Sequence, residues 1–382
     1  MIKRSFLYIS LIVVVALPGC IKETYNMKML SKNAHLSPTL AISAVKGDIS
    51  FRDMVKPNDT VVFDQNKLVI IVFRKDALVD LKLTDFSKGT LTRTATIYPT
   101  SFDLNTKEVL SHISGDFLIS NPSLKFNYSN SFQDSLKINL DVTGKRQDKT
   151  VDLNLAPFAL VKPNIPVQQE VTASYIIDKS NSKLPQLISL PPEVINFSGT
   201  VILSTVVKSD ATGNNILGPN QLIGSLELEI PMEFKMTNLQ LTDTVDNFLK
   251  DDKNGNDNPL NPADFQMLRV NISAKNGFPL GVSLKMSLYD SLTHTIKNTV
   301  DASGILAPAP VDSNGKATGV TETSTSIEFT RDFFSSVNKA DKIIFRFTLI
   351  TTGNGSQDVK IYSDYRINFN AALVVKPDIN LK

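Results

Sequence analysis

The chain has 382 residues, of which 42% are hydrophobic and 20% are charged, and its 40 Lys and Arg nearly balance its 38 Asp and Glu. A chain of this length can bury sizeable cores, and its single cysteine excludes an intramolecular disulfide. The balanced charge argues against nucleic acid as a partner and against purely electrostatic attachment to a membrane.

The first 19 residues have the pattern of an export signal. Lys3 and Arg4 form a basic start, and the apolar run Phe6–Leu17 that follows is too short to span a bilayer as a helix. Leu17-Pro18-Gly19-Cys20 resembles a bacterial lipobox, in which the cysteine is acylated and the chain is cut before it. We therefore expect a signal peptide at 1–19 and lipidation at Cys20. The alternative is an ordinary secretory signal followed by a chance cysteine.

Residues 20–41 are polar, mixed in charge and without sustained periodicity, which predicts a flexible tether after the lipidated cysteine. Lys22-Glu23 resembles the charged export tag of Bacteroidota-type surface lipoproteins. The resemblance implies a lipid-anchored protein of the outer membrane. We expect it on the cell surface, with the periplasmic face of that membrane as the alternative.

Strand-like segments recur from Ile42 onward. They are rich in Val, Ile, Leu, Thr and Phe, and Asn, Asp, Gly and Pro separate them. Many alternate apolar with polar residues, which predicts strands with one buried face and therefore an all-β, antiparallel fold. Only short helices are expected, at 244–250 and 332–339. Because no long crossover segments are visible, a doubly wound parallel fold is not expected.

One pattern occurs twice. Val270–Leu288 and Leu124–Leu140 each hold two alternating runs joined by a short segment that contains Asn, which predicts a hairpin. A shift of 146 residues superposes Asn130 on Asn276. The same shift places Phe132, Leu136, Ile138 and Leu140 on Phe278, Val282, Leu284 and Met286.

Further matches keep the same order along the chain, and they predict an internal repeat. They pair Leu81–Asp85 with Leu239–Asp243, Thr150–Asp152 with Thr299–Asp301, Ala156-Pro157 with Ala307-Pro308, and Thr172, Ser174 and Ile176 with Thr323, Thr325 and Ile327. We expect two tandem, related β-sandwich domains, at 42–224 and 225–382, since stacked half-apolar sheets bury both inner faces. The alternatives are one elongated body joined through Leu226–Phe234 and chance likeness among β-sheet sequences.

Several phrases resemble those of a broad group of uncharacterised Bacteroidota envelope lipoproteins, to which no established activity belongs. They are Asn121–Leu124, Asn276–Leu280 and Lys360–Tyr365. The Asn276–Leu280 phrase with the alternating run after it is also similar to type-2 late-embryogenesis-abundant domains. That similarity implies small β-sandwich domains of the fibronectin type.

Catalytic and cofactor motifs are absent from the sequence. His35, His112 and His294 belong to no metal-binding spacing, and neither a nucleophile elbow nor a phosphate-binding glycine loop occurs. A pair of glycosidase carboxylates stays open because its members can be distant in the chain. We expect a protein that is not an enzyme, with no cofactor, no catalytic residues and no metal site.

The acidic segment Asp251–Asn258 offers oxygen atoms at alternate positions, as calcium loops do. Its glycine is misplaced and no closing Glu follows Asp252, so we expect a hydrated connection. Four Asp-Ser/Thr-apolar triplets begin at Asp59, Asp134, Asp243 and Asp290. They resemble the O-glycosylation sequon of Bacteroidota exported proteins, and turn or capping chemistry is the alternative.

The sequence thus predicts an acylated envelope lipoprotein with a structural or adhesive role, held to the membrane by its lipid and contacting another envelope protein or a glycan. The alternative is a lipid- or glycan-binding surface lipoprotein. Absence of Trp weakens the glycan hypothesis, although the eight Tyr could serve as sugar platforms. An apolar groove for lipid cannot be distinguished from an ordinary core by composition.

Overall fold

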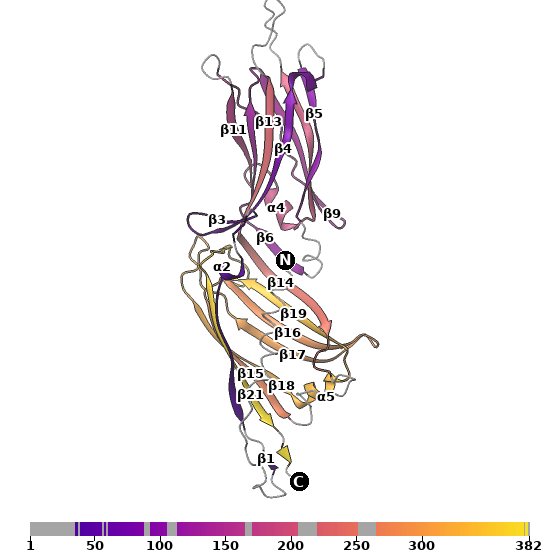
Figure 1. Cartoon of the computed structure of the whole chain (residues 1–382), viewed down its shortest axis with the longest axis vertical. Coiled ribbons are helices and arrows are strands. Elements are labelled where there is room, and N and C mark those ends of the chain that lie inside the picture. The colour runs from indigo at the N-terminus through magenta and orange to yellow at the C-terminus, as the bar shows by residue number, and fades with distance from the viewer. Residues whose placement is uncertain are drawn as a thin grey trace, which may run out of the picture.

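The computed structural model describes residues 35–36, 39–55, 57–58, 60–87, 92–104, 113–164, 170–204, 220–250, 265–377 and 379–380. The described strands form four large antiparallel sheets and a two-stranded ribbon. The all-β, antiparallel fold expected from the sequence is therefore confirmed. The sheets are arranged as two sandwiches stacked end to end, which gives the molecule an elongated shape (Figure 1).

The upper sandwich of Figure 1 contains two facing sheets. The first has the strand order β11-β7-β13-β4-β3, with β3 at Val61–Phe63, β4 at Val69–Lys82, β7 at Ser123–Asn130, β11 at Val171–Ile177 and β13 at Gln221–Pro231. The second has the order β10-β8-β12-β5, with β5 at Thr92–Asp103, β8 at Ser135–Arg146, β9 at Lys149–Asp152 beside β8, β10 at Phe158–Ala159 and β12 at Val194–Ser204. A 3-10 turn, η3 at Leu83–Asp85, follows β4, and helix α4 at Leu184–Ser189 joins β11 to β12.

The lower sandwich also has two sheets. The first has the order β18-β15-β21-β2, with β2 at Leu40–Ser50, β15 at Phe265–Asn276, β18 at Thr321–Thr330 and β21 at Arg366–Pro377. The second has the order β17-β16-β19-β14-β20, with β14 at Glu233–Asp246, β16 at Leu280–Asp290, β17 at Thr295–Leu306, β19 at Lys342–Thr351 and β20 at Val359–Lys360. Strand β6 at Ile113–Ile119 also pairs with β14. Helices α2 at Phe51–Met54 and α5 at Arg331–Val337, and the ribbon of β1 at His35–Leu36 with β22 at Ile379–Asn380, complete it.

The two sandwiches are nested along the chain. β2 comes before the whole upper sandwich, yet it pairs along its length with β21 near the C-terminus. β6 lies between β5 and β7 in the sequence but extends the lower sheet beside β14. The two sandwiches therefore do not coincide with the expected domains 42–224 and 225–382. β2 and β6 precede residue 225 but belong to the lower sandwich, because long-range pairing decides which sheet a strand joins. The upper sandwich is inserted between the first two large strands of the lower one.

Both sandwiches nevertheless have one strand order. β11, β7, β13 and β4 occupy the places of β18, β15, β21 and β2, and β10, β8, β12 and β5 occupy those of β17, β16, β19 and β14. The chain also visits these strands in the same sequence, with α4 and α5 at matching points. This correspondence is what the repeated sequence pattern predicts.

The repeated segment is an arch and not a hairpin. β7 and β8 belong to opposite sheets of the upper sandwich, and β15 and β16 belong to opposite sheets of the lower one. A buried Asn closes each arch: the Asn130 side chain accepts from the Phe132 N–H at 2.9 Å and donates to the Val161 carbonyl at 2.9 Å. Asn276 bonds the Phe278 N–H at 2.9 Å and the Ala307 carbonyl at 2.8 Å in the same way. Asn130 thus corresponds to Asn276, as the shift of 146 residues predicts.

Several of the other sequence matches do not coincide in space. Val171 pairs with Asn130 and Thr321 with Asn276, so the buried Ile177, and not Ile176, corresponds to Ile327. Leu81 lies near the end of β4, which corresponds to β2, whereas Leu239 lies in β14, which corresponds to β5. That match was therefore wrong.

Ala307 corresponds to Val161 rather than to Ala156, because their carbonyls receive the equivalent Asn bonds. The match between Thr150–Asp152 and Thr299–Asp301 agrees with the structure at the level of strands. These segments lie in β9 and β17, which pair with the corresponding strands β8 and β16.

Two further expectations also needed correction. Thr244 and Val245 lie in β14, paired with Ile344 and Ile343, so the helix expected at 244–250 does not form there. The helix expected at 332–339 corresponds to α5. Within the expected tether at 20–41, β1 and the start of β2 are strands because each has a partner near the C-terminus.

One apolar core runs through the upper sandwich and across the junction. Its buried members include Phe126 and Ile138 of the upper sandwich together with Phe234, Val359 and Ile361 of the lower one. A second, smaller core lies deeper in the lower sandwich around Leu288, Ile343 and the α5 phenylalanines. The junction is therefore part of the larger core.

Backbone hydrogen bonds reinforce the junction. The Val69 N–H donates to the Ile361 carbonyl at 3.0 Å, and the Ile361 N–H donates to the Met232 carbonyl at 2.9 Å. The Ser363 N–H donates to the Lys67 carbonyl at 2.9 Å. The segment 359–363 thus lies between strands of both sandwiches and bonds to each of them.

Candidate functional site: a basic pocket at the junction

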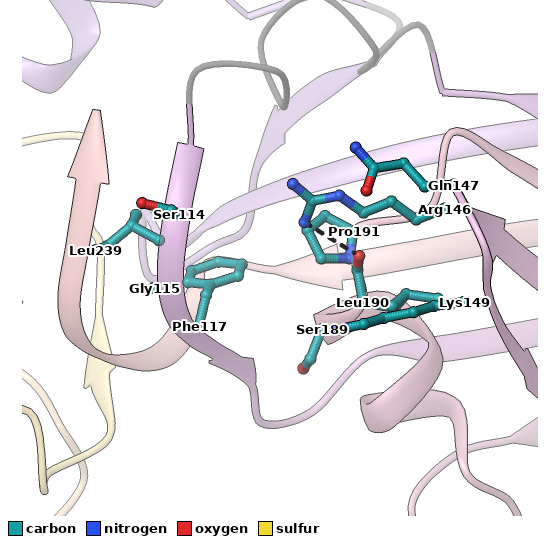
Figure 2. Close-up of a pocket in the computed structure, with 10 residues that line it drawn as sticks. All are labelled: Ser114, Gly115, Phe117, Arg146, Gln147, Lys149, Ser189, Leu190, Pro191 and Leu239. Carbon is teal, nitrogen blue, oxygen red and sulfur yellow. Dashed lines mark hydrogen bonds between the residues drawn. The ribbon is translucent and has the colours of Figure 1, made fainter. Parts of the chain in front are cut away.

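A pocket of about 380 Å³ lies at the junction of the two sandwiches. Its walls come from β6 on one side and from the β8–β9 turn and the segment after α4 on the other (Figure 2). The lining residues are Ser114, Gly115, Phe117, Arg146, Gln147, Lys149, Ser189, Leu190, Pro191 and Leu239. Because β6 pairs in the lower sheet, each sandwich contributes part of the wall.

The local sequence explains why β6 can form this wall. Gly115 has a φ of +109°, and a Cβ built there would lie 2.3 Å from the Asn238 carbonyl oxygen. Only glycine therefore allows β6 to approach β14 this closely. The Phe117 and Phe234 rings lie 5.2 Å apart and join β6 to the junction core. The Ser189 hydroxyl accepts from the Ile119 N–H at 2.9 Å and ties β6 to α4.

The polar side of the pocket is basic. Arg146 and Lys149 are directly opposed in the β8–β9 hairpin. Figure 2 shows the Arg146 guanidinium beside Leu190, to whose carbonyl it donates at 3.4 Å. The ten lining residues include no carboxylate and no His, so the pocket offers groups that bind an anion but no acid–base pair. Its signal in the sequence is the short turn Lys145–Lys149, which holds three basic residues beside Asp148 and resembles an ordinary solvated turn.

A second polar cluster at the junction surrounds two tyrosines. The Tyr365 hydroxyl accepts from the Ala317 N–H at 2.7 Å, and its ring packs edge-on against Phe278 at 5.7 Å. Burial raises the pKa of Tyr365 to about 12. Burial also raises the pKa of Tyr362. The Lys316 ammonium lies over the Tyr362 ring, 5.2 Å from its centroid. These contacts fix the loop before β18 to the junction.

None of the ten residues that line the pocket is one that the sequence predicted to be functional. Cys20 and the acidic segment 251–258 lie outside the described residues, as does His112. His35 begins β1, and His294 lies in the β16–β17 turn with its Nδ1 3.1 Å from the Tyr289 hydroxyl. Among the described residues, no group of three or more His, Cys, Asp or Glu is placed to hold a metal ion.

The hydroxyls of the four Asp-Ser/Thr triplets differ in accessibility. Thr60, Ser135 and Thr244 are exposed. Ser291 is partly buried and donates to Asp341, and this bond lowers the pKa of the Asp341 carboxyl. Turn chemistry therefore explains Ser291, where the side chain and the N–H both bond to Asp341. Within the part of the chain that the structure describes, no helix is both long and apolar enough to cross a bilayer.

Comparison with known proteins gives no family for the chain. No family model and no curated protein matches it. Among solved structures, a candidate secreted protein from Parabacteroides distasonis has a TM-score of 0.48 and 14% identity, with 88% of this chain and 99% of that chain covered. The VP2 subviral particle of infectious bursal disease virus has a TM-score of 0.19 and 9% identity, covering 98% of this chain and 77% of its own.

Proposed function

We propose that this chain is a lipid-anchored outer-membrane lipoprotein whose two sandwiches act as a rigid, non-catalytic spacer with a structural or adhesive role in the envelope. The observation that carries the proposal is the junction, where a single apolar core and a shared backbone segment join the sandwiches. Separate domains on flexible linkers move relative to each other by default, and such a junction opposes that motion.

The direction of the spacer follows from the positions of its strands. β1, which begins 15 residues after Cys20, pairs with β22 at the end of the lower sandwich opposite the junction (Figure 1). A lipid on Cys20 therefore puts the lower sandwich nearer the membrane and presents the upper sandwich to partners. Lys22-Glu23 resembles an export tag, and this resemblance favours display on the cell surface. The expected partner is therefore another envelope protein or a glycan.

The anchor is tested by Cys20→Ala in the full chain expressed in its native host. We expect the variant to leave the membrane fraction or to remain uncleaved, and to incorporate no labelled palmitate. A diacyl group on Cys20 together with an amide-linked chain is enough for stable attachment, whereas a single acyl chain holds a protein to a bilayer only marginally. Lys22→Ala is the matched control and should retain both lipid and membrane location. Palmitate incorporation by Cys20→Ala would contradict the proposal.

A further inference from the structure

Two like charges lie face to face at the junction pocket. Arg146 and Lys149 are directly opposed partners at the end of the β8–β9 hairpin. Opposed residues of an antiparallel pair extend to the same side with Cβ atoms about 5 Å apart, so both cations can reach one anionic group. Such an anion would receive two charge-assisted contacts.

The rest of the pocket is largely apolar. Phe117 and Leu239 form the wall on the lower-sandwich side, and Leu190 and Pro191 form the wall beside Arg146 (Figure 2). A volume of about 380 Å³ lies within the usual range for small-molecule sites. A ligand that satisfies both parts needs one anionic group and a compact apolar body. A neutral sugar lacks the anionic group and a compact apolar body, and a neutral lipid lacks the anionic group.

We propose that the junction pocket binds a small anionic amphiphile, that is, an acyl or aryl group ending in a carboxylate, phosphate or sulfonate. The anionic group lies between Arg146 and Lys149, and the apolar body packs against Phe117 and Leu239. Since the walls belong to different sandwiches, the bound ligand joins them and stabilises the junction. This binding role goes beyond the spacer function and does not depend on the lipid anchor.

The proposal is tested with 8-anilinonaphthalene-1-sulfonate, an anionic aromatic probe whose fluorescence rises in apolar surroundings. The full mature chain should bind one probe molecule saturably, and laurate or dodecyl phosphate should displace it. Lys149→Gln should weaken binding at least about tenfold, because a charge-assisted contact is lost. Ser114→Trp, which fills the pocket from the exposed start of β6, should abolish binding without changing the charge.

Lys137→Gln is the matched control, since Lys137 is exposed on β8 and does not line the pocket. It should bind the probe as the unmodified chain does. N-phenyl-1-naphthylamine has a similar ring system but no sulfonate, so it should bind more weakly and be insensitive to Lys149→Gln. Circular dichroism of each variant confirms folding. Equal binding of the two probes, or binding unchanged in both Lys149→Gln and Ser114→Trp, would overturn the proposal. Displacement by laurate but not by dodecyl phosphate would assign the site to carboxylates, and the reverse result to phosphates.

Discussion

At the scale of single residues, two buried asparagines hold the arches of the two sandwiches. Asn130 and Asn276 are both fully buried, and each bonds a backbone N–H and a backbone carbonyl that lie outside the strands. Buried backbone groups left without partners are costly, which explains why a polar side chain lies inside an apolar core. Asn276 also donates to the Leu280 carbonyl at 2.8 Å.

Replacement of either asparagine should destabilise its arch. Asn130→Ala is expected to lower the free energy of unfolding by about 2 kcal/mol, because it leaves the buried Phe132 N–H without its acceptor and removes the bond to the Val161 carbonyl. Chemical denaturation monitored by circular dichroism measures the change. Asn196→Ala, at an exposed position of β12, is the control and should stay within about 0.5 kcal/mol of the unmodified chain. An equal, small effect for both variants would show that the Asn130 bonds do not hold the arch.

Tyr365 gives the junction a dependence on alkaline pH. Burial raises its pKa to about 12, above the value near 10 of an unfolded tyrosine, so the neutral form stabilises the fold. The contribution is complete below about pH 10 and is lost as the pH rises towards 12. The difference in unfolding free energy between the unmodified chain and Tyr365→Phe should therefore fall over that interval. A difference that does not change with pH would mean that Tyr365 titrates normally.

At the scale of secondary-structure elements, periodicity predicted the strands well but not their partners. The alternation in Leu136, Ile138 and Leu140 predicted buried side chains, and these three are at most 1% exposed. The same alternation is compatible with a hairpin or an arch, because either leaves one face of each strand buried. The Asn-Gly pair suggested the hairpin, whereas Asn276 acts through its side chain in an arch. Likewise, nothing local in β2 indicates that its partner lies more than 300 residues away.

The candidate pocket was less predictable than the strands. Arg146 and Lys149 are the first and last residues of a four-residue turn. In the sequence this turn looks like any solvated hairpin end. Only the departure of β6 from the upper sandwich places Phe117 opposite them. That departure depends on pairing with β14, more than 100 residues later, and on a glycine at 115 whose need for positive φ is visible only in the structure.

The lower sandwich offers a direct test of strand orientation. Leu284 packs against the smaller core, whereas its neighbour Lys285 is exposed. Leu284→Asp should lower the free energy of unfolding by roughly 2–4 kcal/mol, because it places a charge against apolar side chains. Lys285→Ala should change it by less than about 1 kcal/mol, since it removes only a surface ion pair with Asp301 at 3.9 Å. Thermal or urea denaturation of both variants distinguishes the two faces, and a reversed order of effects would refute this orientation.

At the scale of the whole molecule, nesting and the junction make two sandwiches into one body. The chain enters the upper sandwich after α2 and leaves it through β13 into β14, with one more excursion through β6. Each passage is fastened by strand pairing or by the hydrogen bonds of segment 359–363. Such fastening opposes motion of one sandwich relative to the other.

The rigidity of this body is the central claim, and a distance distribution between the sandwiches tests it most directly. Replacement of Cys20 by Ser removes the only cysteine, so Thr96→Cys and Ser324→Cys, at exposed positions of β5 and β18, can carry one spin label each. Double electron–electron resonance on the mature chain should give a single narrow distance that matches the separation of these two positions in the structure. A broad or multiple distribution, in samples whose circular dichroism shows folded sheets, would contradict the account, because it would mean that the sandwiches move independently.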